Sequence, residues 1–230
     1  MLFRDDNEEK RQQWLKNTLS ALPSGASILD AGAGELKSKR LCNHLDYVSQ
    51  DFCQYQGGGS ALKEGLQGQS WDTSKIDIVS DIISIPVADA SFDAILCTEV
   101  FEHIPDPLRA LDEFSRILKP NGVLVLTAPF SSNVHMAPHY FCTGFSKYWY
   151  EHHLQLRGFS IKSLVANGNW HELLFQEITR LGSVDRGQKN WFWPLSYLYS
   201  FLGVIYFKLC KRGETNDLAC FGWHCLAVKL

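Results

Sequence analysis

The sequence predicts an open α/β fold, with a doubly wound, mostly parallel sheet of seven strands and helices on both faces. Two observations lead to this prediction. Short apolar runs alternate with helical stretches along most of the chain, which is the rhythm of βαβ units in a parallel sheet. The first apolar run ends in an acid and a glycine turn, Ser27-Ile28-Leu29-Asp30-Ala31-Gly32-Ala33-Gly34-Glu35. Open sheets build a nucleotide crevice from such a strand, turn and helix.

The remaining elements follow from apolar periodicity. Strands are expected near residues 26–30, 46–50, 76–80, 92–97, 122–128, 158–161 and 219–228. Residues 7–22 have helical spacing of apolar positions, and Pro23-Ser24-Gly25 ends that run. This N-terminal helix, within residues 1–24, could simply cover the sheet. A second helix from Pro107 to Leu118 carries an apolar face for the core. We treat residues 1–230 as a single domain.

Composition excludes some classes of protein. The chain is 45% hydrophobic and its net charge is −3, so it lacks the basic surplus of a sequence-independent nucleic-acid binder. Its seven cysteines include no C-x-x-C pair, and the first residues are charged rather than apolar. Reduced thiols without an export signal indicate a cytoplasmic protein.

The glycine turn does not match a dinucleotide fingerprint, because the third glycine of G-x-G-x-x-G would fall on Lys37. Asp30-Ala31-Gly32-Ala33-Gly34 instead resembles the D-x-G-x-G motif of class I S-adenosylmethionine-dependent methyltransferases. In that family the turn wraps the amino-acid end of the cofactor, and a helix such as the one expected within residues 1–24 lies across the cofactor cleft. Leu36 stands where the family often has a further glycine.

Three later segments resemble the same family in the same order. The run ending in Asp51 resembles the second strand, whose acid accepts hydrogen bonds from the ribose hydroxyls; an ionised carboxylate suits that role because it only accepts. The run ending in Asp81 resembles the third strand, with Asp81 toward the adenine amino group and the Ile82 backbone at the ring edge. Residues 85–104 and 116–126 resemble the type 11 methyltransferase group.

The resemblance covers roughly residues 26–130 and implies a Rossmann-like fold with S-adenosylmethionine as the cofactor. The cofactor-binding residues that it implies are Asp30, Ala31, Gly32, Ala33, Gly34, Asp51, Phe52, Asp81, Ile82 and Thr98.

Candidate catalytic groups lie after the fourth strand and in the loop after the fifth. Glu99 and His103 are four residues apart and would share a face if this segment is helical. His103 is a base suited to neutral pH, or else it caps or packs the next element. His135 and His139 are the alternative bases. Pro138 interrupts this H-x-x-x-H pair, and no H-E-x-x-H pattern is present, so no metal is expected.

Residues 129–157 form the expected acceptor loop and helix, because ligands bind beyond the carboxyl ends of parallel strands. Its aromatic residues could stack on a sugar or an apolar acceptor, or could pack against one another.

Residues 183–215 form an aromatic, hydrophobic insertion. Its segment from Trp191 to Phe207 carries no charge and is flanked by lysine and arginine. The segment is just short of the roughly 20 residues that cross a bilayer. A buried helix and an interfacial helix are both open, and spanning is the least favoured reading. We expect a peripheral membrane contact, at the inner face, or a homodimer through residues 191–207.

The function expected from these features is S-adenosylmethionine-dependent O-methylation of a saccharide or other small-molecule acceptor. One alternative is methylation of a lipid-like or quinone acceptor at a membrane surface. Another is a non-catalytic cofactor-binding subunit of a larger enzyme.

Overall fold

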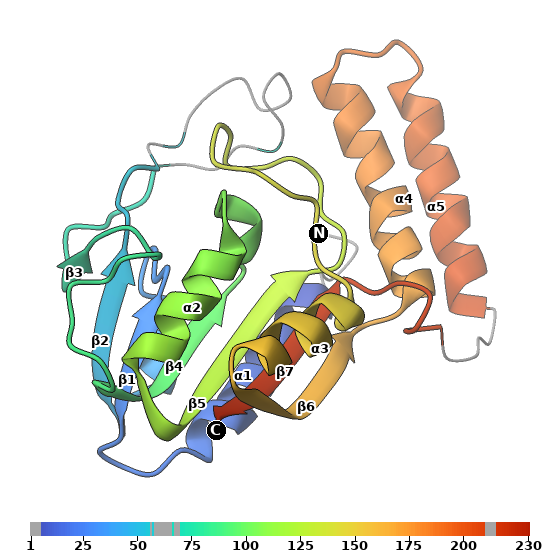
Figure 1. Cartoon of the computed structure of the whole chain (residues 1–230). Coiled ribbons are helices and arrows are strands. Elements are labelled where there is room, and N and C mark those ends of the chain that lie inside the picture. Colours follow the sequence, from blue (N-terminus) through green and yellow to red (C-terminus); the bar gives the residue numbers. More distant parts are fainter. Residues whose placement is uncertain (1–5, 56, 58–65, 67–69, 210–214) are drawn as a thin grey trace.

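A single mixed sheet organises the chain (Figure 1). The computed structural model describes residues 6–55, 57, 66, 70–209 and 215–230. The strands are β1 (Ser27–Ala31), β2 (Asp46–Asp51), β3 (Ile78–Val79), β4 (Phe92–Thr98), β5 (Leu118–Pro129), β6 (Phe159–Asn167) and β7 (Gly222–Lys229), in the order β3-β2-β1-β4-β5-β7-β6. β7 is antiparallel to β5 and β6, whereas the other pairs are parallel. The predicted seven-stranded, mostly parallel sheet is confirmed.

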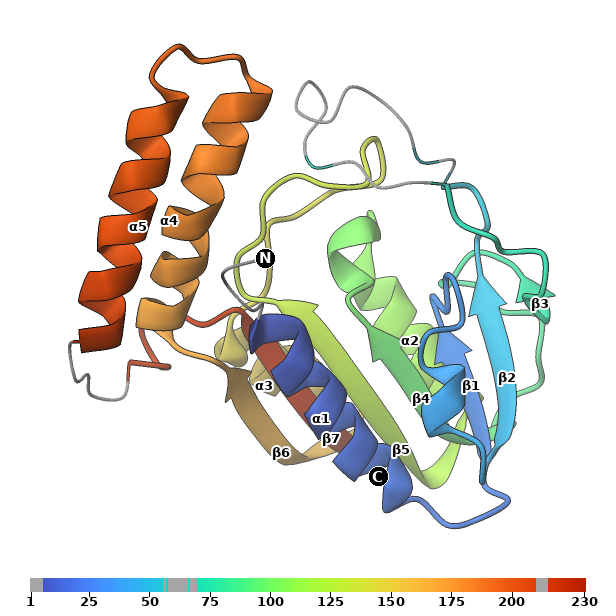
Figure 2. The ribbon, with the colours of Figure 1, turned by 180° about the vertical axis from the view of Figure 1, so that it is seen from behind.

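Helices cover both faces of the sheet. The helices α2 (Pro107–Ile117) and α3 (Lys147–Leu156) lie on one face, and α1 (Asp6–Ser20) crosses the other (Figures 1 and 2). Successive side chains of a strand point to opposite faces of the sheet, so a hydrophobic core forms on each face. Leu29 and Ile95 belong to the core under α2 and α3, and their neighbours Ile28 and Leu96 pack beneath α1.

The helix expected after the glycine turn is absent. Residues 32–38 form consecutive turns, followed by the short 3₁₀ helix η1 (Lys39–Leu41). This stretch offers only Leu36 and Leu41 as large apolar residues, too few for a stripe that a helix could bury. Between β2 and β3, residues 56, 58–65 and 67–69 lie outside the described part of the chain.

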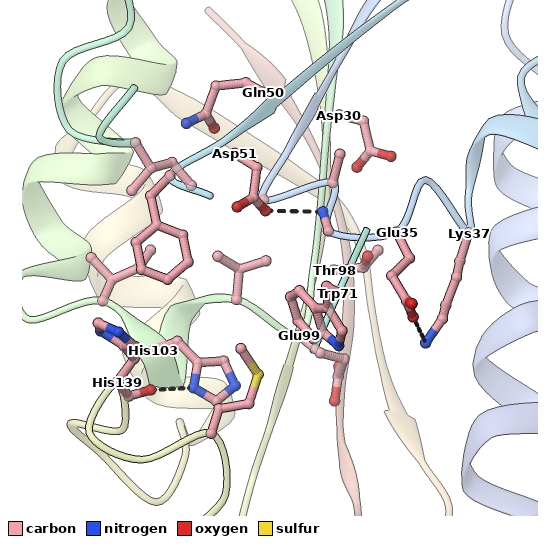
Figure 3. A pocket seen from close by; sticks show the side chains of 18 of the residues that line it. Asp30, Glu35, Lys37, Gln50, Asp51, Trp71, Thr98, Glu99, His103 and His139 are labelled. Carbon is pink, nitrogen blue, oxygen red and sulfur yellow. Dashed lines mark hydrogen bonds and ion pairs between the residues drawn. The ribbon is translucent and has the colours of Figure 1, made fainter. Parts of the chain in front are cut away.

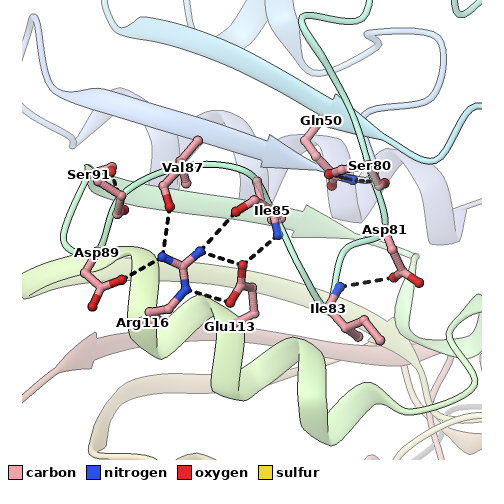
Figure 4. A network of polar contacts seen from close by, with 11 residues as sticks. Gln50, Ser80, Asp81, Ile83, Ile85, Val87, Asp89, Ser91, Glu113 and Arg116 are labelled. Carbon is pink, nitrogen blue, oxygen red and sulfur yellow. Dashed lines mark hydrogen bonds and ion pairs between the residues drawn. The ribbon is translucent and has the colours of Figure 1, made fainter.

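A polar network fixes the entry into β4 (Figure 4). The Arg116 guanidinium on α2 donates to both carboxylate oxygens of Glu113, to Asp89, and to the carbonyls of Ile85 and Val87. Glu113 in turn accepts the backbone N–H of Ile85 at 2.7 Å. The network therefore ties residues 85–89 to α2 and sets where β4 begins.

A helical hairpin, α4 (Trp170–Gly187) and α5 (Trp193–Leu209), is inserted between β6 and β7 and stands beside the sheet (Figures 1 and 2). The inserted element thus begins at Trp170, earlier than the predicted start at residue 183, and residues 210–214 lie outside the described part. Gly182 lets α4 approach the Tyr197 ring, and Ser200 Oγ donates to the Ile178 carbonyl at 2.6 Å. Among the described helices, none is both long and apolar enough to cross a membrane.

Candidate functional site

The turn after β1 is held by β2. The backbone N–H groups of Gly32 and Ala33 both donate to the Gln50 carbonyl at 2.9 Å. Gly32 and Gly34 have φ of +78° and +51°, in the region that favours glycine. Leu36 also has a positive φ, +60°. The loop therefore keeps a left-handed residue where the family often has glycine, at a conformational cost of about 1–2 kcal/mol.

Asp51 and Asp81, the predicted ribose and adenine ligands, accept hydrogen bonds from backbone N–H groups. Asp51 accepts the N–H groups of Gly34 and Cys53 at 2.9 and 2.8 Å. Asp81 accepts the N–H of Ile83 at 3.1 Å. A carboxylate has about four acceptor sites, so each group keeps capacity for further donors.

Asp30 is a buried acid at the start of the turn. Its carboxylate accepts a hydrogen bond from the Tyr47 hydroxyl at 2.6 Å. Burial, with the nearby charge of Asp51, raises the pKa of Asp30 to about 7 despite this hydrogen bond. A neighbouring cation would lower the pKa of Asp30 again and keep the carboxylate ionised, so the position suits a positively charged ligand group.

Opposite the turn, residues 130–146 fold over the end of β4. This acceptor loop is attached to the 3₁₀ helix η2 (Phe101–His103), because Phe141 N–H donates to the Glu102 carbonyl at 2.8 Å. His103 Nδ1 lies 2.6 Å from the His139 carbonyl, and the His139 ring packs edge-on against Phe52. The loop thus brings histidines of two segments to one wall (Figure 3).

Two ionisable groups at this wall, His103 and Glu102, have pKa values far from their ordinary ones. Burial lowers the pKa of His103 to about 4, and His135 and His139 add to the effect. The carbonyl of His139 only accepts, so Nδ1 carries the proton and Nε2 is free. Burial, reinforced by Glu99, raises the pKa of Glu102 to about 8, while Arg11 opposes the rise.

One cavity of about 700 Å³ joins these walls. Its lining includes the glycine turn, the ends of β2 and β4, and the acceptor loop. The N-terminal half of α1 adds Glu8, Arg11, Gln12 and Leu15. Figure 3 shows Asp30 and Asp51 on one side of this space and His103 and His139 on the other. The volume is typical of small-molecule and cofactor sites.

Comparison with known protein families identifies the central part of the chain. Residues 29–126 match the model of the family described as "Methyltransferase domain". These residues are a methyltransferase domain. The match confirms the resemblance drawn from the motifs.

Curated relatives of this methyltransferase domain match a similar stretch. A ubiquinone biosynthesis O-methyltransferase of Xylella fastidiosa (strain 9a5c) is 32% identical over 105 residues, which are 45% of this chain and 42% of that protein. An uncharacterized methyltransferase of Mycobacterium sp. (strain JLS) is 29% identical over 127 residues, 51% of this chain and 46% of that protein. The chain therefore spans less than half the length of these relatives.

Solved structures share the fold over almost the whole chain. The [4+2]-cyclase SpnF has a TM-score of 0.57 at 20% identity, over 96% of this chain and 80% of that one. A putative sarcosine dimethylglycine methyltransferase from Galdieria sulphuraria has a TM-score of 0.56 at 16% identity, over 97% and 84%. At these identities the likeness shows a class I, Rossmann-like fold.

The methyltransferase domain brings most of the predicted site residues together. Nine of the ten predicted cofactor residues line the cavity, and Ala31 is buried in the sheet core instead. Glu99, His103, His135 and His139 all line it. The expected helical pairing of Glu99 with His103 does not form, because Glu99 has φ +53° and only the short η2 follows.

Sequence reasoning missed two contributors to the site. Arg11 enters the cavity from α1, and its position four residues before Leu15 on one helical face was the available signal. The buried side chain of Gln50, next to Asp51, also lines the cavity, and its Oε1 has no hydrogen-bond partner among the described residues. Gln50 has no signal in the sequence, because its role depends on the loop that β2 faces.

Proposed function

We propose that the protein transfers a methyl group from S-adenosylmethionine to an oxygen of a small-molecule acceptor. The observation that carries this proposal is the cavity, which joins the motif residues of the methyltransferase domain to a wall of histidines. The motif side suits the cofactor, and the histidine side suits a hydroxyl that loses a proton.

The residues on the motif side fit the cofactor. Asp30 offers a buried carboxylate that a cofactor ammonium group would ionise. Asp51 and Asp81 keep acceptor capacity for ribose and adenine donors. The unpartnered Gln50 Oε1 is a further acceptor beside Asp51. We therefore assign cofactor binding to these four side chains and the Gly32–Gly34 turn.

The rest of the cavity provides position and proton transfer. When bound, S-adenosylmethionine supplies an electrophilic methyl group on a sulfonium sulfur, which leaves as a neutral thioether. Alignment of the acceptor with that methyl group contributes much of the acceleration, of order 7–11 kcal/mol for well-oriented reactants. The acceptor hydroxyl gives its proton to an imidazole at the opposite wall, where His103 Nε2 is unprotonated.

The class of acceptor follows from the surroundings of the cavity. A saccharide would stack on the aromatic residues of the acceptor loop. The exposed hairpin instead favours an amphipathic phenol or quinol drawn from a membrane surface. The named Xylella fastidiosa relative belongs to ubiquinone biosynthesis, which agrees with that class.

The hairpin has the composition of an interfacial element. At its tip, Trp191 is 87% exposed and Phe192 is 62% exposed. Arg186 and Lys189 lie at the same tip, and the Arg186 guanidinium lies over the Trp193 ring. Aromatic side chains beside basic ones suit the headgroup region of an anionic membrane. We infer that the hairpin contacts a membrane surface, with a homodimer contact as the competing assignment.

Labelled methyl transfer tests the proposal directly. The protein is incubated with isotope-labelled S-adenosylmethionine and panels of phenols, quinols and saccharides, and products are found by mass spectrometry. A labelled methyl ether is expected, and the panel that yields it decides the acceptor class. Cofactor binding with no labelled product in any panel or cell extract would favour the non-catalytic subunit. Failure to bind the cofactor would reject the proposal.

A further inference from the structure

Three side chains beside the cavity converge on one point. Each of Glu102, His103 and His135 offers one ligand atom, and these atoms lie within 4.8 Å of one another. The Nε2 atoms of His103 and His135 are 3.7 and 3.8 Å from Glu102 Oε1. The two imidazole rings are nearly perpendicular, with centroids 4.5 Å apart. Two loop segments thus supply a carboxylate and two imidazoles to one site.

Backbone carbonyls orient both imidazoles toward that point. His103 Nδ1 is 2.6 Å from the His139 carbonyl, and His135 Nδ1 is 2.9 Å from the Asn133 carbonyl. A carbonyl oxygen only accepts, so each Nδ1 carries the proton and each Nε2 presents a lone pair. Histidines that bind metals commonly donate their other ring N–H to a carbonyl or carboxylate in this way.

The carboxylate between them lacks partners that its burial requires. Glu102 is 1% exposed, and its Oε2 has no hydrogen-bond partner among the residues that the structure describes. At 3.7 and 3.8 Å, the contacts of Oε1 with the two imidazoles are too long for hydrogen bonds. A buried polar atom without a partner is costly, so this side chain calls for a further ligand.

We propose that Glu102, His103 and His135 bind a divalent transition-metal ion, with Zn²⁺ as the best match. Two imidazoles and one carboxylate are a donor set that suits Zn²⁺ and its neighbours better than Mg²⁺, which prefers oxygen. Tetrahedral Zn²⁺ ligands are about 3.4 Å apart, so the observed spacing closes around an ion through small side-chain rotations. In the sequence His135 is spaced to pair with His139, whereas in the fold His135 lies against His103.

The fourth position of such an ion would face the cavity, because His103 and His135 both line it. This consequence rests on the proposed methyl transfer. An acceptor hydroxyl in that position would bind the metal through its oxygen and release its proton to solvent more readily. The metal would then replace His103 as the group that activates the acceptor.

Metal titration of the purified protein tests the site without any turnover. After chelator treatment and dialysis, Zn²⁺ binding is measured by calorimetry, and Co²⁺ binding by visible absorption. One ion per chain is expected for the wild type. Glu102→Gln and His135→Ala should each weaken Zn²⁺ binding by about 100-fold or more, since even outer-shell losses cost 10–100-fold.

His139→Ala is the matched control, because it removes a neighbouring imidazole that is not in the cluster and leaves the carbonyl that His103 binds. It should keep the wild-type Zn²⁺ affinity. Thermal melting and S-adenosylmethionine affinity, measured on each variant, show whether it is folded. A wild type that takes up no Zn²⁺ or Co²⁺, or a His135→Ala variant that binds as tightly as wild type, would overturn the metal site.

Methyl transfer and metal binding can be tested independently of each other. Methyl transfer by a protein that binds no metal would leave the proposed function intact and remove the metal site. One tightly bound Zn²⁺ in a protein that binds no S-adenosylmethionine would do the reverse.

Discussion

The guanidinium of Arg11 on α1 contacts the carboxylate of Glu99 at the end of β4, with Nη1 2.9 Å from Oε2. Glu99 also accepts a hydrogen bond from the Thr127 hydroxyl at 2.8 Å. These contacts fasten the N-terminal helix to the rim of the cavity. α1 therefore both covers the sheet, through Leu15 and Leu19, and closes the cavity.

Removing this contact should loosen the helix that closes the cavity. We expect Arg11→Ala to lower the free energy of unfolding by about 1–2 kcal/mol, because Glu99 loses its cation. S-adenosylmethionine affinity should fall by roughly 10-fold, or about 1.4 kcal/mol. Calorimetry and denaturant titration measure the two effects. Lys16→Ala, on the exposed side of the same helix, should change neither; equal losses in both variants would contradict the role of Arg11.

Cofactor affinity should depend on pH through Asp30. Its pKa of about 7 means that this carboxyl is largely protonated below neutral pH, and an ammonium ligand must then displace the proton. Affinity for S-adenosylmethionine should therefore rise between about pH 6 and pH 8 and then level off. Calorimetry across that range measures the rise. Asp30→Asn should abolish this rise and lower the affinity reached at high pH. The control variant Asp46→Asn, which changes an exposed acid at the start of β2, should retain the rise.

The raised pKa of Asp30 also makes the stability of the cofactor-free protein fall as the pH rises, whereas cofactor affinity increases. Because burial raises this carboxyl pKa above its unfolded value, ionisation disfavours the folded cofactor-free protein as pH rises from about 4 through 7. Asp30→Asn should therefore raise the melting temperature of the cofactor-free protein at pH 8 while weakening cofactor binding. A lowered melting temperature at pH 8 would show that burial of the charge is not the dominant effect.

Position 32 must be glycine because Val100 packs against it and leaves no room for a side chain. A Cβ atom at this position would lie 2.5 Å from Cγ2 of Val100, and φ is +78°. Gly32→Ala should therefore destabilise the cofactor-free protein by about 2–5 kcal/mol, the sum of backbone strain and overpacking. Any side chain at position 32 would therefore disturb the fold as well as cofactor contact.

Gly25→Ala separates the two causes, because Gly25 has φ +76° with nothing within 4 Å of its Cβ position. That variant should lose only the backbone contribution, about 1–2 kcal/mol. The double variant Gly32→Ala, Val100→Ala should recover part of the difference. Equal destabilisation of the Gly25 and Gly32 variants would rule out the clash with Val100.

The hairpin tip should determine membrane binding. Replacing Trp191 and Phe192 by serine should reduce binding to anionic vesicles by roughly 100-fold or more, since each buried aromatic contributes about 1.5–3 kcal/mol. Sedimentation with vesicles measures the change. Tyr148→Ser is the control, because it changes an exposed aromatic side chain of α3, away from the hairpin. A wild type that ignores vesicles and forms a dimer split by the tip substitutions would assign the surface to self-association.

The motif half of the site was predictable because it depends on local order. Asp30, Asp51 and Asp81 each lie at or just beyond the carboxyl end of a separate strand, and parallel strands bring these ends to one edge. Glu102 and His135 were not predictable as neighbours, because 32 residues of sequence and an irregular loop separate them. The missing helix after Gly34 shows a limit of another kind: the usual strand, turn and helix of an open sheet would place a helix there, but the segment has too few apolar residues to bury one.

The hairpin enters and leaves the sheet at a single point, since Asn167 at the end of β6 is paired with Gly222 at the start of β7. These two strands are antiparallel neighbours, so a two-residue turn could join them directly. The two helices are therefore an insertion at one corner of the sheet, which the pairing of β6 with β7 does not require. A version of the protein without them would separate two questions that the intact chain poses together: which molecule it methylates, and where it meets that molecule.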